Sequence, residues 1–335
     1  MKRIVWFSIV MVGLLSVFVN IGFAAEMKTI VFLRTELMPP LTEYILEGLK
    51  QGGFVPQENI TLQEIIVSAT EDIPQLVERI KDAHPDIVLT TVEYANVLAA
   101  LNGLSIPVVT RLNVEPYVNA EGIPTANITG IYSTLHDMFF NSYKFLQKVA
   151  PLKAGQAVVF LENPEFPPIP KAKVIDALQR LQIPLKAVAS ATVYEDWQTA
   201  VLQYSNDPEV GWILQASPTR KRDGSRLDLI AEIYPWQQEH FKKPTVTYWD
   251  TPVQAGDLCA FGMDMNEASI QFGRMAARVL QGEPINTIKV EYPVKVSIVL
   301  NRKTATNLGI VFSMDVLNLA DVIYDDYEGK QVIRK

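Results

Sequence analysis

The stretch Asp257–Pro284, DLCAFGMDMNEASIQFGRMAARVLQGEP, decides how the rest of the chain is interpreted. Leu258–Phe261 is a short apolar run typical of a buried strand, and a polar turn follows it. Asn266 is a favourable N-cap for the helix expected next, which Gly282 and Pro284 end. One face of that helix carries a narrow stripe of mostly small residues: Ile270, Gly273, Ala277 and Leu280. The pattern predicts a strand–turn–helix unit whose helix lies close to a sheet.

This unit places Asp264 at the carboxyl end of its strand. In open α/β sheets, ligands bind at the carboxyl ends of the strands, so Asp264 is a candidate ligand-binding residue. A second interpretation is that Asp264 only caps the turn. A role in binding predicts that Asp264→Ala abolishes the response to a ligand while leaving the melting temperature of the ligand-free protein nearly unchanged.

The first residues of the chain predict a cleaved export signal. Met1–Arg3 is basic, Ile4–Ile21 is almost wholly apolar, and Gly22 and Ala24 are small residues at the −3 and −1 positions of a cleavage site. We therefore expect residues 1–24 to be a signal peptide. An uncleaved membrane anchor is the alternative, because the apolar run is close to the ~18 residues that can span a bilayer. The cleavage site has no cysteine, so we expect a periplasmic protein that is not a lipoprotein.

Composition limits the class of the mature chain. Its 335 − 24 = 311 residues exceed what one core usually serves, so two lobes are expected. Without Lys2 and Arg3 the net charge falls from −7 to 28 − 37 = −9, which disfavours nucleic acid as a partner. Cys259 is the only cysteine, so no internal disulfide is possible.

Strands and helices alternate along the first half of the mature chain, as in βαβ units with a parallel sheet. Apolar runs predict strands at Thr29–Leu33, Ile60–Val67, Asp86–Thr90 and Ile106–Thr110. Helical spacing predicts helices at Leu41–Leu49, Glu71–Ala83 and Tyr94–Leu101. Pro124–Ser133 lacks a helical period and is expected to cross to a second lobe.

The same alternation then restarts. Strands are expected at Ala157–Leu161, Leu185–Ser190, Val210–Gln215 and Thr245–Trp249, with helices at Asp137–Val149, Lys171–Leu181, Trp197–Tyr204 and Asp228–Phe241. Thr287–Leu300 is expected to make a further crossing. We predict an α/β fold of two Rossmann-like lobes with parallel sheets and a three-segment hinge: 25–129 plus 251–288 form the first lobe, and 130–250 plus 289–335 the second. Val316–Ile323 has helical spacing, and the tail is either a frayed end or a docking element.

Polar side chains follow the expected strands of the first lobe, where ligand-binding residues collect in such sheets. They are Thr35, Glu36, Thr91, Glu93 and Asn113. Each residue alone is also typical of a solvated loop. Together with Asp264 they predict a site between the lobes, with Tyr132, Phe166, Tyr248 and Trp249 as apolar walls.

Two further regions complete a pattern that resembles a known family. Asn301, Thr304, Ala305, Leu308 and Gly309 match an Asn-x-x-Thr-Ala-x-x-Leu-Gly segment, and ANITGIYS at 126–133 matches an Asn-x-Thr-Gly crossing. With GMDMNEASIQFGRMAARVLQGEP, these segments resemble the substrate-binding proteins of ABC transporters, of the tryptophan/tyrosine type. LVERIKDAHPDIVLTTVEYANVLAA, at 76–100, resembles the same family.

The resemblance implies a type I periplasmic binding fold that captures a small solute and delivers it to an ABC permease. Several members bind an aromatic amino acid. The positions it carries over are Thr35, Thr91, Asn113, Asn163, Thr219, Asp250 and Asp264. This chain departs from the family after Asn163, where Glu165–Pro170 has three prolines and no hydroxyl in place of Ser and Asn. An α-amino acid is therefore not implied as the ligand.

Other classes of function have weaker support. His84, His136 and His240 are scattered, and no Walker, Gly-x-Gly-x-x-Gly or Gly-x-Ser-x-Gly motif is present, so we expect no enzyme, cofactor or metal. Docking on a membrane sensor kinase instead of a permease stays open. Glu36, Glu93, Asp250 and Asp264 would favour an amine-bearing solute, and the protein is expected to be a monomer.

Overall fold

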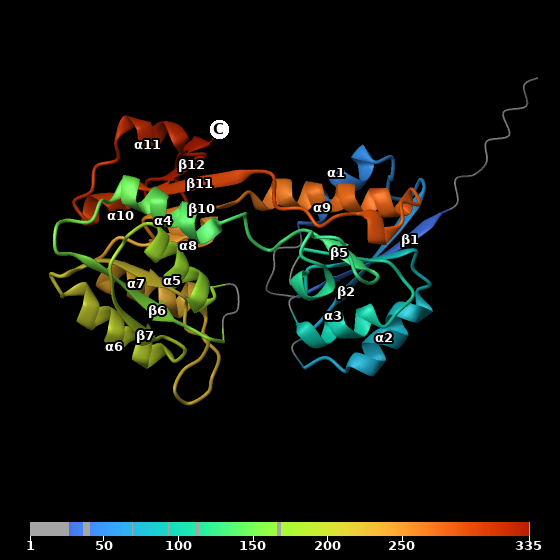
Figure 1. Cartoon of the computed structure of the whole chain (residues 1–335), viewed down its shortest axis with the longest axis horizontal. Helices are drawn as coiled ribbons and strands as arrows, with labels where there is room; N and C mark the ends of the chain where they lie inside the picture. Colours follow the sequence, from blue (N-terminus) through green and yellow to red (C-terminus); the bar gives the residue numbers. More distant parts are fainter. Residues whose placement is uncertain are drawn as a thin grey trace, which may run out of the picture.

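The computed structural model of the chain describes residues 27–35, 41–68, 70–92, 94–111, 114–165 and 169–334. These residues form two α/β lobes that lie beside each other (Figure 1). The expected signal peptide, residues 1–24, lies outside the described residues. The two-lobed α/β architecture predicted from the sequence is confirmed.

Five parallel strands form the sheet of the first lobe, in the order β2-β1-β3-β4-β5. They are β1 (Lys28–Arg34), β2 (Ile60–Ile66), β3 (Ile87–Thr90), β4 (Val108–Thr110) and β5 (Ile128–Gly130). Successive residues of β1 enter different apolar clusters, Ile30 and Phe32 on one face and Val31 and Leu33 on the other. The continuous apolar run is needed because helices cover both faces of this sheet.

Two pairs of helices provide that cover. Helices α2 (Ile73–Asp82) and α3 (Ala95–Asn102) pack on one face, and α1 (Thr42–Gln51) and α9 (Met265–Leu280) pack on the other (Figure 1). Two 3₁₀ turns, Glu115–Tyr117 and Ile285–Thr287, complete the lobe.

The small residues of α9 mainly serve a contact between helices. A Cβ atom on Gly273 would lie 2.1 Å from the carbonyl oxygen of Ile45, and one on Gly48 would lie 2.0 Å from that of Ile270. Glycine at both positions lets α1 and α9 touch backbone to backbone. The expectation that the small stripe faces the sheet is therefore incomplete, because the larger Phe272 and Met275 join the sheet's apolar cluster.

The second lobe contains two groups of strands. The first group, in the order β7-β6-β8, comprises β6 (Ala157–Glu162), β7 (Leu185–Ser190) and β8 (Val210–Gln215). The second, in the order β13-β12-β11-β10-β9, comprises β9 (Val246–Thr247), β10 (Cys259–Met263), β11 (Val296–Asn301), β12 (Val322–Tyr324) and β13 (Gln331–Arg334). Strand β11 runs antiparallel to β10, so this part is mixed where only parallel strands were expected.

Helices cover both faces of the second lobe as well. Helices α4 (Met138–Val149) and α5 (Lys171–Arg180) share one apolar cluster, and α6 (Tyr194–Ser205) and α7 (Tyr234–His240) share another. A five-residue π-helical segment, Leu229–Ile233, precedes α7. The short helices are α8 (Asp250–Gln254), α10 (Arg302–Asn307) and α11 (Met314–Leu319).

The sheets divide the chain differently from the sequence-based boundaries. Residues 251–263 were assigned to the first lobe, but β10 pairs with β9 and β11, and Val253 of α8 packs against Ala260. The chain therefore returns to the first lobe at Asp264, after the strand and not before it. In the last crossing, Glu291 forms an isolated β-bridge with Ile131, which directly follows β5 of the first lobe. The second lobe therefore begins again after Glu291 and not at residue 289.

The tail is an integral part of the second lobe. After α11 the chain forms β12 and β13, which extend the mixed group of strands. Ile323 and Tyr324 are buried in β12, so the first of the two alternatives for the tail, a frayed end, is wrong. The helical spacing seen up to Ile323 is also misleading, because α11 ends at Leu319. The β-branched and aromatic residues of β12 favour a strand once β11 offers a partner edge.

Candidate functional site

The first-lobe side of the candidate site is the carboxyl-terminal edge of its sheet. Thr35 follows β1, Thr91 follows β3 and Arg111 follows β4, and all three residues are 5% exposed or less. Backbone hydrogen bonds between adjacent strands fix the positions of two of them. The Thr91 N–H donates to the Leu33 carbonyl at 3.0 Å, and the Arg111 N–H donates to the Thr90 carbonyl at 3.1 Å. Of the strand-end residues predicted from the sequence, Thr35 and Thr91 therefore lie at the same edge.

Arg111 is the residue at this edge that sequence reasoning did not select. Its Nη1 donates to Oγ of Ser269 on α9 at 2.9 Å, and that hydroxyl donates to the Met265 carbonyl at 2.7 Å. Burial lowers the pKa of Arg111 to about 10, so the guanidinium stays charged at neutral pH. The sequence feature that could have identified Arg111 is its position directly after the apolar run IPVVT at 106–110.

On the second lobe, Asn163 and Thr219 lie in the loops after the neighbouring strands β6 and β8. Asn163 is 1% exposed, and its Nδ2 donates to the Ser217 carbonyl at 2.7 Å while its Oδ1 accepts from the Glu165 N–H at 3.0 Å. Thr219 Oγ1 donates to Glu165 Oε2 at 2.8 Å, and this bond, followed by one from Arg220, lowers the pKa of Glu165. These contacts tie the two loops to each other.

A pocket of about 150 Å³ brings three other predicted residues together at the second-lobe edge. Trp249, Asp250 and Asp264 line it with Asn266 and Lys295, at the carboxyl ends of β9 and β10. Trp249 stands edge-on to the ring of Tyr248, with ring centres 5.8 Å apart. The pocket therefore offers an indole, carboxylates and one lysine close to the hinge.

Asp264 is the N-cap of α9, a position that the sequence had assigned to Asn266. Its Oδ1 accepts from the N–H groups of Asn266 and Glu267, both at 3.0 Å, and its Oδ2 pairs with Lys295 Nζ at 2.8 Å. Burial opposes its ionisation, but Lys295 and the two N–H groups prevail and keep the pKa of Asp264 below its usual value. Asp264 therefore caps the turn, and its role in binding stays a prediction.

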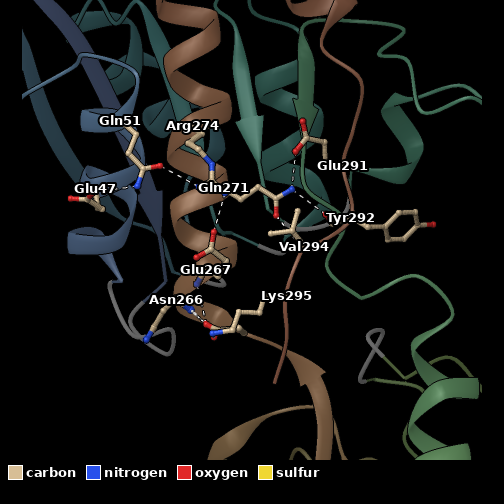
Figure 2. Close-up of polar contacts among 11 residues, drawn as sticks. Glu47, Gln51, Asn266, Glu267, Gln271, Arg274, Glu291, Tyr292, Val294 and Lys295 are labelled. Atoms are coloured by element: carbon tan, nitrogen blue, oxygen red, sulfur yellow. Dashed lines mark hydrogen bonds and ion pairs between the residues drawn. The ribbon is translucent and has the colours of Figure 1, made fainter. Parts of the chain in front are cut away.

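A polar network joins helix α9 to the last crossing between the lobes (Figure 2). Gln271 Nε2 donates to Glu291 Oε2 at 2.7 Å and to the Tyr292 carbonyl at 3.1 Å, and its Oε1 accepts from the Val294 N–H at 3.2 Å. The Gln271 side chain thus binds the last crossing at three positions between residues 291 and 294. Tyr132, in the first crossing, stacks on Tyr292 with ring centres 4.3 Å apart.

Three predicted site residues, Glu36, Glu93 and Asn113, lie outside the described residues, as does the aromatic Phe166. Within the described part of the chain, no group of three or more His, Cys, Asp or Glu side chains is arranged to hold a metal ion. No helix in that part combines the length and hydropathy that crossing a bilayer requires.

Comparison with known proteins gives one family and several solved structures. The family model described as ABC transporter substrate binding protein matches residues 27–323. A Streptococcus pneumoniae ABC domain in complex with L-Trp is 15% identical, with a TM-score of 0.68 over 88% of this chain and 99% of that one. No match was found among curated proteins.

Two further structures have the same fold. A ligand-free, open substrate-binding protein with adhesive properties from Clostridium difficile is 18% identical, with a TM-score of 0.67 over 89% of this chain and 99% of that one. A conserved domain protein from Vibrio cholerae gives the same identity, TM-score and coverage. At these identities the likeness concerns the fold.

Proposed function

This chain belongs to the ABC transporter substrate-binding protein family, and we propose that it captures one small solute by closing its two lobes around it. The observation that carries the proposal is the hinge. All three crossings leave or enter the lobes at the edge that holds the carboxyl ends of the parallel strands, as at Gly130 and Met263. Ligands of α/β sheets bind at that edge, so closure would enclose a ligand between two such edges.

The size of the pocket supports closure. Its volume of about 150 Å³ is below the ~300–1,000 Å³ that is usual for ligand sites, which suits one half of a site. A solute that contacts both edges gains its full contacts only in the closed form, so it shifts the population of conformers toward closure.

The residues proposed to contact the solute come from both lobes and the hinge. They are Thr35, Glu36, Thr91, Glu93 and Asn113 of the first lobe, Asn163, Thr219, Trp249 and Asp250 of the second, and Tyr132 and Asp264 of the hinge. Asn163 and Asp264 already have partners for their polar atoms, so we assign them mainly to positioning. Trp249 supplies apolar surface beside the exposed Asp250, which suits an aromatic or amine-bearing solute.

Family membership favours delivery of the solute to an ABC permease over docking on a membrane sensor kinase. The family is a class of binding proteins and not of enzymes. We propose that the protein works in the periplasm after removal of residues 1–24. Cell fractionation and amino-terminal sequencing of the mature protein test this, with a start at Ala25 expected. A full-length chain in the membrane fraction would contradict it.

Capture itself is tested by thermal-shift screening of the mature protein against amino acids, amines, carboxylic acids and nucleosides. A ligand at 100 times its Kd stabilises the folded protein by about 2.7 kcal/mol, which raises the melting temperature by several degrees. We expect a narrow chemical class to do so. Absence of any shift across the panel would count against solute capture.

A further inference from the structure

Arg111 directly follows β4 at the carboxyl-terminal edge of the first-lobe sheet. Its side chain is 3% exposed and lies between the carboxyl end of β4 and the second turn of α9. Thr91 follows the neighbouring strand β3 at the same edge and is also buried. The guanidinium is therefore built into the strand-end edge and is held there by Ser269.

Among the described residues, the side-chain partner of Arg111 is Ser269, which does not balance its charge. A guanidinium has five N–H donors, and the contact seen here gives one of them to a neutral hydroxyl. No carboxylate of the described residues forms an ion pair with it, and burial is the one cause that perturbs its pKa. A buried charge without a counter-charge is costly, and such groups persist mainly where function requires them.

Surface arginines of the same protein show the contrast. Arg180 is half-exposed and contacts both Asp137 and Asp176, and Arg278 contacts both Glu283 and Glu291. These two solvent-accessible arginines thus contact two carboxylates each, whereas the buried Arg111 contacts a neutral hydroxyl. Arginine is the side chain best suited to bind planar anionic oxygen groups through two parallel N–H bonds.

We propose that Arg111 anchors an anionic oxygen group of the solute, a carboxylate or a phosphate, at the first-lobe edge. Ser269 orients the guanidinium by accepting one N–H, which leaves the remaining donors for the anion. This assignment rests on the proposed solute capture and gives the solute its chemical class: it is negatively charged at the end held by the first lobe.

The test compares acids with their neutral counterparts on the mature protein. The probes are succinate with succinamide, 4-hydroxyphenylacetate with 4-hydroxyphenylacetamide, N-acetyl-L-tryptophan with N-acetyl-L-tryptophanamide, and glycerol 3-phosphate with glycerol. We expect at least one acid or phosphate to raise the melting temperature, and its neutral counterpart to have no effect. The pairs distinguish the two anions. A shift caused by the neutral members alone would overturn the assignment while leaving solute capture intact.

Two variants complete the test. Arg111→Gln should weaken binding of the active acid by about 10- to 100-fold, the range expected for a lost bond to a charged group. Arg180→Gln is the matched control, because it removes an arginine that lies on the surface, and its affinity should equal that of the wild type. Equal affinity in Arg111→Gln and the wild type would contradict the proposal.

A measurement without any probe separates anchoring from a structural role. If Arg111 serves binding, the ligand-free Arg111→Gln protein should melt at the wild-type temperature or above it, because an uncompensated buried charge has been removed. A melting temperature lowered by several degrees would show that the arginine is needed for folding, and the assignment would fall.

Discussion

The hinge and the first-lobe strand edge are built from similar polar residues but use them differently. At the hinge, Asp264 fills both carboxylate oxygens with two N–H groups and Lys295, and Gln271 uses both ends of its amide on the last crossing. At the edge, the buried Arg111 has Ser269 as its described side-chain partner. Polar groups that the protein satisfies itself stabilise structure, and those it leaves unsatisfied are available to a solute.

A second buried charged group shows why the state of Arg111 is informative. Asp257 is fully buried in the second lobe and accepts a hydrogen bond from Gln237. Burial raises its pKa to about 7, so this carboxyl can lose its charge by taking up a proton as the pH falls below about 7. The Arg111 guanidinium, with a pKa of about 10, cannot lose its charge in this way at neutral pH. Its charge must be met by a partner.

The largest expected effect concerns α9, which supplies residues to both regions. Gly273→Ala places a Cβ 2.1 Å from the Ile45 carbonyl and 2.9 Å from the Leu49 N–H, and neither backbone group can move freely. We expect a loss of about 3 kcal/mol in the free energy of unfolding, measured by urea denaturation. Gly103→Ala, whose Cβ would meet only the Ala100 carbonyl at 3.4 Å, is the control and should change little. Equal effects would contradict the close α1–α9 contact.

Asp257 predicts a pH dependence. Its folded-state pKa of about 7 lies above an unfolded value near 3.8, so the folded state binds more protons between these values. Its contribution to stability is fully present below about pH 4 and is lost as pH rises through 7. Between pH 5 and 8 the wild type should lose about 2–3 kcal/mol relative to Asp257→Asn. Parallel stability curves for the two proteins would refute the burial effect.

At the hinge, Gln271→Ala removes the amide partner of the Tyr292 carbonyl and of the Val294 N–H, while the Glu291 carboxylate loses Gln271 but keeps Arg278. We expect a loss of about 2 kcal/mol in ligand-free stability, in contrast to Arg111→Gln, which should lose none. Gln51→Ala removes an exposed amide nearby and serves as the control. If Gln271→Ala proved neutral and Arg111→Gln destabilising, the comparison between the two regions would be reversed.

Asp264→Ala should cost about 1 kcal/mol, the usual value of an N-cap. The sequence predicted a nearly unchanged melting temperature for this variant without ligand, and the cap bonds revise that prediction. Because the folded-state pKa of Asp264 is lowered, its contribution is present above the unfolded pKa and is lost as pH falls through the folded one. Thermal melts at pH 7 and pH 2.5 check this, with a larger difference between variant and wild type expected at pH 7 than at pH 2.5.

Much of the architecture was readable from the chain because buried parallel strands are continuous apolar runs, such as AVVFL at 157–161, which became β6. The lobe of β10 was not readable, because the run LCAF fits either sheet and pairing with β9 and β11 decides it. The N-cap was misplaced by two residues, since Asp264 and Asn266 are both good caps and only the backbone distinguishes them.

The site was less predictable than the fold. Position after a strand correctly brought Thr35 and Thr91 to one edge, but it cannot tell a saturated residue such as Asn163 from an unsatisfied one. Arg111 was passed over because burial and the lack of a counter-charge are properties of the folded chain. The roles of Glu36, Glu93 and Asn113 stay predictions.

Closure of the lobes around one solute is the central claim, and small-angle X-ray scattering tests it most directly. The mature protein is measured alone and with the panel compound that raises its melting temperature most, at saturating concentration. We predict a smaller radius of gyration with the compound for the wild type and no decrease for Arg111→Gln at the same concentration. An unchanged radius of gyration in a wild type that demonstrably binds the compound would contradict the account.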